Sequence, residues 1–112
     1  MGNTNIVHAL LSLDKRVNDS ELSNNEKNAL KVLIEKLLKY YKKKIEEINK
    51  TSNFYIARNK DFKLTSEMTD YIVAINDAIK RKIDTFGVAN TITRKINAEE
   101  KKGFFKIKRL SQ

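Results

Sequence analysis

One apolar stripe constrains the fold of this chain more than any other feature. Between residues 24 and 50, hydrophobic side chains recur every three or four positions, at Leu30, Ile34, Leu37, Tyr41, Ile45 and Ile48. This spacing places them on one face of an α-helix, and that face needs other elements to cover it. Ser23 and Glu26 have the spacing of a capping box, which predicts that the helix begins beside them.

A second stripe predicts another helix, over residues 65–86. Thr65 or Ser66 is expected to cap its N-terminus. Glu67 is favourable to the helix dipole there. Gly87 is expected to end the helix in a left-handed conformation. The apolar face of this helix consists of Met68, Ile72, Ile75, Ile79, Ile83 and Phe86.

The remaining segments before residue 65 are shorter and less regular. Residues 6–13 form a candidate apolar helix that is too short to stand alone and must dock on the rest of the chain. Residues 17–23 are polar and are expected to form a loop. Residues 53–62 fit a short strand or a short helix, and we interpret their aromatic side chains, Phe54, Tyr55 and Phe62, as part of the core.

The hydrophobic period changes after Gly87. Residues 92–96 and 104–110 alternate between apolar or β-branched and polar side chains, and a polar loop ending in Gly103 separates them. Such alternation predicts a β-hairpin. The alternative is a helix capped by Asn97, with Glu100 three residues later. The predicted fold is therefore mainly α with a C-terminal β-hairpin, and the alternative is an all-α helical bundle.

We expect a single domain over residues 1–112. Its parts are an N-terminal helix and loop in residues 1–23, a helical core in residues 24–87, and a basic hairpin, or wing, in residues 88–112. No stretch approaches the ~20 apolar residues of a membrane span. The N-terminus lacks the pattern of a secretion signal, so a cytoplasmic location is expected, without integral membrane contact.

Composition argues against catalysis. The chain has no Cys and a single His, His8, which excludes a disulfide framework, a thiolate metal site and a two-histidine zinc site. Its sequence contains no glycine-rich phosphate loop and no nucleophile elbow. We therefore predict a non-enzymatic protein without a cofactor or metal. The net charge of +9 lies mainly in residues 24–50 and 88–112 and indicates an anionic partner.

Together these patterns resemble the winged helix-turn-helix domains of phage and plasmid replication and regulatory proteins. Three groups of residues carry the resemblance: 13–17 with 22–27, then 56–57 with 62–65 and the stripe from Met68, and finally Gly87 and Val88 with 92–96 and 104–110. The resemblance implies duplex DNA as the partner. It also implies a recognition helix that starts near Thr65 and a basic wing at the C-terminus.

Two groups of residues are the predicted nucleic-acid contacts. Hydroxyl and amide groups of the second helix suit phosphates and adenine, and the Lys side chains of the wing suit a phosphate backbone. The first group is Thr65, Ser66, Thr69 and Asn76, and the second is Lys95, Lys101, Lys102, Lys106 and Lys108.

A different class of function is the alternative. Two long amphipathic helices and the absence of catalytic motifs are equally typical of a small helical protein-binding module, of the immunity-protein or phage-inhibitor type. Its basic charge would then serve an acidic protein partner or a membrane surface. The helix over residues 24–50 is also a candidate homodimer interface, with Tyr40 and Ile48 expected at its surface.

Overall fold

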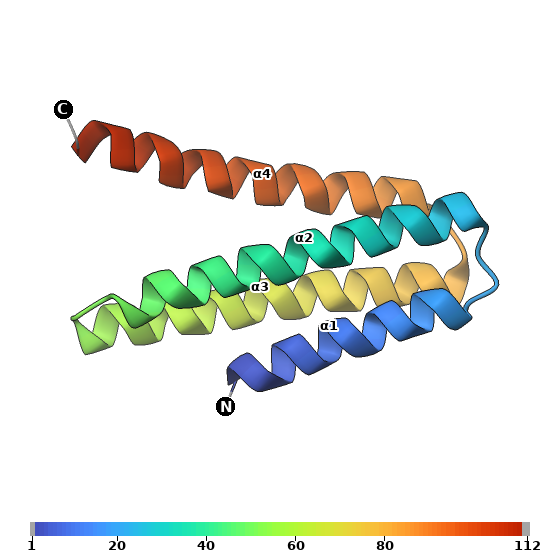
Figure 1. Ribbon diagram of the computed structural model, residues 1–112, viewed down its shortest axis with the longest axis horizontal. Helices are drawn as coiled ribbons and strands as arrows, with labels where there is room; N and C mark the ends of the chain where they lie inside the picture. The colour runs from blue at the N-terminus through green and yellow to red at the C-terminus, as the bar shows by residue number, and fades with distance from the viewer. Residues whose placement is uncertain (1, 111–112) are drawn as a thin grey trace.

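The computed structural model describes residues 2–110, with side chains described for residues 5–102. Four α-helices follow one another: α1 (Gly2–Asp19), α2 (Asn24–Asn49), α3 (Phe54–Arg81) and α4 (Thr85–Leu110). The three connections are only a few residues long, so consecutive helices run in opposite directions (Figure 1). Residues 2–110 contain no strand.

The bundle is flat, with α2 and α3 at its centre. Both α1 and α4 pack against α2 and α3, whereas α1 and α4 do not contact each other within the described residues. The Cα positions extend 48 × 32 × 16 Å. A layer this thin has one core, which lies along α2 and α3.

The core confirms the stripe that the sequence predicts for α2. Leu30, Ile34, Leu37 and Tyr41 are buried, while Ile45 and Ile48 pack against the core and remain partly exposed. The other helices contribute buried side chains at the same three- or four-residue spacing. These are Ile6, Leu10, Leu13 and Val17 of α1, Leu64, Met68, Tyr71 and Ile75 of α3, and Ala89, Ile92 and Ile96 of α4.

Helix α3 begins much earlier than the sequence predicts. Asn53 is its N-cap, and its side-chain oxygen accepts a 3.1 Å hydrogen bond from the Ile56 N–H. The predicted start at Thr65 or Ser66 is therefore wrong, because both residues lie in the fourth turn of a continuous helix. A hydroxyl side chain followed by an acid indicates a helix start. Asn53, twelve residues before Thr65, is also a good N-cap residue, and it caps the helix.

The predicted C-terminal hairpin is wrong. Residues 85–110 form the single helix α4, so neither a wing nor the winged helix-turn-helix fold is present. Ile92 and Ile96, the ends of the first predicted strand, are four residues apart and share the buried face of a helix. The alternative that we considered, an all-α helical bundle, is the architecture observed.

The turn between α3 and α4 also differs from its prediction. Lys82, not Gly87, takes the left-handed conformation that ends α3, with φ of 57°, and Asp84 follows with φ of 55°. Gly87 lies in the first turn of α4, where an added Cβ would collide with the Asp84 carboxylate. The glycine therefore provides space for the Asp84 side chain.

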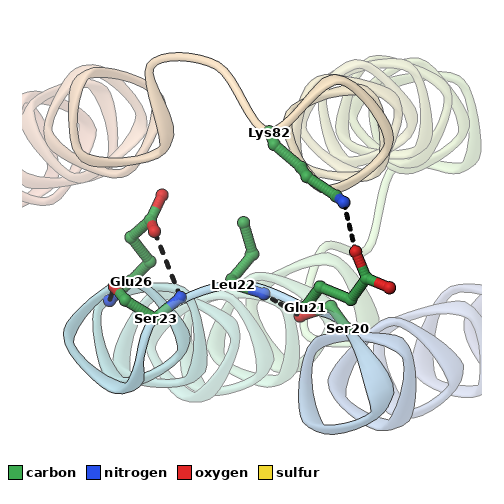
Figure 2. A network of polar contacts seen from close by, with 6 residues as sticks. All are labelled: Ser20, Glu21, Leu22, Ser23, Glu26 and Lys82. Carbon is green, nitrogen blue, oxygen red and sulfur yellow. Dashed lines mark hydrogen bonds and ion pairs between the residues drawn. The ribbon is translucent and has the colours of Figure 1, made fainter.

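A polar network fixes the end of the bundle where α1 meets α2 and α3 meets α4 (Figure 2). The predicted capping box is confirmed: the Ser23 hydroxyl accepts from the Glu26 N–H, and the Glu26 carboxylate accepts from the Ser23 N–H, each at 3.2 Å. The bond from the Ser23 N–H lowers the pKa of the Glu26 carboxyl, and the nearby hydroxyls of Ser23 and of the buried Thr85 in α4 lower it further. Glu21 pairs with Lys82 across the two connections, which lowers the pKa of Glu21.

We expect Ser23→Ala to destabilise the protein by about 1 kcal/mol, because the Glu26 N–H at the start of α2 loses the side-chain oxygen that caps it. Urea unfolding followed by circular dichroism measures the change. Ser52→Ala is the control, since Ser52 is exposed and precedes the N-cap of α3. Equal stability of the two variants would contradict a role for the capping box.

Candidate nucleic-acid interface

Helix α1 covers only part of its neighbours. The Arg16 guanidinium donates a 2.7 Å hydrogen bond to the Asn76 side chain, which joins residues 60 positions apart. Since α1 and α3 run in the same direction (Figure 1), this register puts Gly2 level with Phe62. The first eight residues of α3, about 12 Å of helix, therefore extend beyond α1.

The ends of α2 and α4 extend beyond α1 in the same direction. Thr85 lies beside Glu26, and Glu99 lines the same groove as Tyr40, so α4 runs along α2 with an offset of 59 residues. With this offset, residue 101 of α4 is level with residue 42 of α2. We define the open end of the bundle as residues 42–63 and 101–110, which include the turns beyond α1 and the turn level with its first residues.

The open end holds the whole net charge of the protein. Residues 42–63 contain seven Lys and Arg against three Asp and Glu, and residues 101–110 contain five against none. These two segments sum to +9, which equals the net charge of the chain, so the remaining residues are neutral as a set. The exposed basic side chains described there are Lys42, Lys43, Lys50, Arg58, Lys60, Lys63, Lys101 and Lys102. The antiparallel helices thus gather charges that are far apart in the sequence.

The open end also exposes large aromatic side chains. Phe54, Tyr55 and Phe62 are 65%, 77% and 79% exposed. Phe54 and Tyr55 lie in the turns of α3 beyond α1, and Phe62 lines the groove between α3 and α4. Our assignment of these three residues to the core is therefore wrong. The rings of Phe54 and Tyr55 meet edge to face with centroids 5.8 Å apart, and the Arg58 guanidinium lies 5.9 Å from the Phe54 ring centre. Arg58 thus shares one face of α3 with the aromatic rings.

A groove at the open end has balanced charges. Its volume is about 360 Å³, and its charged lining consists of Lys44, Lys60, Lys63, Glu47, Glu67 and Glu99. At its base, the buried Tyr40 hydroxyl donates a 2.7 Å hydrogen bond to Glu67. Burial and this bond raise the pKa of Tyr40, and burial beside Glu67 raises the pKa of Tyr71 to about 12. Both phenols stay neutral at pH 7, and the three lysines of the groove are balanced by its three glutamates. The groove therefore does not attract an anion.

Two of the predicted contacts on α3 have hydrogen-bond partners within the protein. Thr69 donates to the Thr65 carbonyl within the helix, and Asn76 accepts from Arg16 of α1, so the Asn76 amide is already engaged. Ser66 is exposed, but it lines a groove of about 670 Å³ between α3 and α4 that includes Asp70 and Asp84. Acidic groups repel phosphates, so the surroundings of Ser66 are unfavourable for a phosphate contact.

The predicted lysines of the wing lie along a helix instead. Lys95 lines the same groove as Ser66. Lys101 and Lys102 are exposed at the open end, and the Lys102 Nζ lies 3.4 Å from the Glu99 Oε1. Lys106 and Lys108 fall in the last turns of α4, and their side chains lie outside the described residues. Four of the five predicted lysines therefore belong to the open end, although no strand connects them.

The structure alters one further prediction. Tyr40 was expected at the surface of a homodimer interface, but it is buried between helices. The predicted site did not include the basic residues of the open end that lie in α2, in α3 and between them, among them Lys42, Lys43, Lys50, Arg58, Lys60 and Lys63. The charge run from residue 42 indicates a basic surface, but only the helix lengths show that it lies at the same end of the bundle as the α3 aromatics.

The fold and its open end define a small four-helix bundle with a basic and aromatic pole. Comparisons with known protein families, curated proteins and solved structures find no match for this chain, so its site is interpreted from its own geometry. No helix within the described residues combines the length and apolar character needed to cross a membrane. Among the same residues, no three His or carboxylate side chains gather as candidate metal ligands.

Proposed function

We propose that this protein is a non-enzymatic nucleic-acid-binding protein that contacts the phosphate backbone through its open end. The observation that carries the proposal is the concentration of the whole net charge, +9, in residues 42–63 and 101–110. A polyanion approaching this pole releases condensed counterions as the lysines neutralise its phosphates, which makes binding favourable at low salt. Lysine suits such contacts because its ammonium group requires no particular base geometry.

Fluorescence anisotropy of a labelled oligonucleotide, measured across a salt series, tests this proposal. The logarithm of the affinity should fall linearly with the logarithm of salt concentration. We expect K43Q/K60Q/K101Q to weaken binding and to reduce the magnitude of the salt slope by about two to three, because three phosphate contacts are lost. These three side chains are exposed, so the fold should not change.

The matched control is K15Q/K80Q/R81Q. It also removes three exposed positive charges, but these lie outside the open end. Its salt slope should stay close to that of the parent protein. Equal losses for both triple variants would contradict a localised interface. Absence of binding at low salt would overturn the proposal and would favour the alternative partner, an acidic protein.

A further inference from the structure

We propose that the open end selects single-stranded over duplex nucleic acid, with Phe54, Tyr55 and Phe62 of α3 stacking on unpaired bases. This inference rests on the proposed function and names the form of nucleic acid that is bound. It starts from the exposure of the three rings, each of which is at least 65% exposed. Such a group of exposed aromatics needs an explanation in a small helical protein, where rings are normally buried.

The three rings share one face of α3. At 100° per residue, positions 54, 55, 58 and 62 fall within a sector of about 100°. Phe54 and Phe62 are eight residues apart, which separates them by about 12 Å along the helix axis. Arg58 lies between them and carries a positive charge within 5.9 Å of the Phe54 ring centre. The face therefore alternates ring, cation and ring along its length.

This arrangement matches the chemistry of a single strand. Unpaired bases offer aromatic faces beside a charged backbone, and their stacking on protein rings contributes to affinity without sequence preference. In a duplex the bases stack on each other, and only their edges are accessible in the grooves. Rings on the protein surface therefore gain little stacking energy from a duplex, whereas the lysines still contact its phosphates.

The surface fits a lipid headgroup layer less well. A helix that lies in a membrane interface presents a continuous apolar face. On α3 the same face continues from Phe62 into the polar residues Thr65, Ser66 and Thr69. The aromatic surface is thus confined to the first turns of the helix, where the positive charge of the bundle is also concentrated.

Anisotropy with a labelled oligothymidine and with a labelled duplex of equal length tests the selectivity. We expect tighter binding of the single strand. F54A/Y55A/F62A should lose at least tenfold in single-strand affinity and less than twofold in duplex affinity, with the salt slope unchanged because no charge is removed. The control, L11A/V32A/I83A, truncates three exposed apolar side chains outside the open end and should bind like the parent.

A fluorescent reporter gives a second, independent measurement. The chain has no Trp, so Tyr55→Trp places a single indole on the proposed stacking surface while keeping it aromatic. Oligothymidine should quench its emission and the duplex should not. Equal quenching by both, or equal affinity losses of F54A/Y55A/F62A for both, would overturn the stacking inference and leave the proposed function standing. Absence of binding to either oligonucleotide, including a case where vesicles containing anionic lipid bind instead, would overturn both.

Discussion

Ser66→Pro should destabilise the bundle by about 3 kcal/mol or more. Ser66 lies in the interior of the 28-residue helix α3. Proline there removes a main-chain hydrogen bond, and its ring clashes with the carbonyl group one turn earlier. Circular dichroism should show a lower helix content or a large fall in the urea midpoint. If Ser66 were in the first turn of a helix, as its sequence context indicates, proline would be tolerated.

Asn24→Pro is the matched control for this substitution. Asn24 is the first residue of α2, directly after the N-cap Ser23, whose φ of −64° and ψ of 160° are extended. A residue before proline favours this conformation, and the N–H of the first helical residue has no partner within the helix. We expect a change below about 1 kcal/mol. A tolerated Ser66→Pro would contradict a continuous α3.

Leu37→Ala should cost about 3 kcal/mol of folding free energy. Leu37 is fully buried in the core, in the central helix α2. Its truncation removes buried apolar surface and leaves a cavity that packed helices fill only in part. For a chain of this size, the loss corresponds to a fall in Tm of roughly 10 °C or more. Calorimetry or thermal circular dichroism measures it.

The control for Leu37→Ala is Val32→Ala in the same helix. Val32 is 66% exposed, so its truncation removes few packing contacts, and alanine has the higher helix propensity. We expect a change within about 0.5 kcal/mol. A similar loss for both substitutions would mean that α2 is not oriented with Leu37 in the core and Val32 in solvent.

The two substitutions in α2 probe the part of the fold that sequence reasoning predicts well. The stripe from Leu30 to Tyr41 is long, regular and preceded by Ser23 and Glu26 at capping-box spacing. Period, length and cap signal all favour one helix, and the structure has that helix. Agreement between several local signals is what makes a sequence pattern decisive.

The C-terminal segment shows why a short pattern misleads. Ile92 and Ile96 are four residues apart. An even separation places two side chains on the same face of a strand, and a separation of four also places them on the same face of a helix. β-Branched neighbours such as Thr91 and Thr93 add a preference for strands. In the bundle, burial of Ile92 and Ile96 against the other helices outweighs that preference, since tertiary packing overrides weak local propensity.

The α3 residues illustrate a limit of a different kind. Phe54, Tyr55 and Phe62 are apolar enough for a core, and apolar periodicity identifies a face that can be buried without showing whether another element reaches it. Here α1 begins level with Phe62, so the earlier turns of α3 stay exposed. Their availability for stacking depends on the register of two helices, which side-chain pairs such as Arg16 with Asn76 help to set.

The sequence by itself determined the helical character of residues 24–49, the position of its cap and a net charge of +9, because these depend on local spacing and composition. Only the tertiary structure decided where that charge lies. Alternating helix directions bring residues 42–63 and 101–110 to one pole, and a short α1 leaves the pole open. Contacts between residues about sixty positions apart set where the charge lies and how far α1 covers the bundle. No local sequence pattern encodes such contacts.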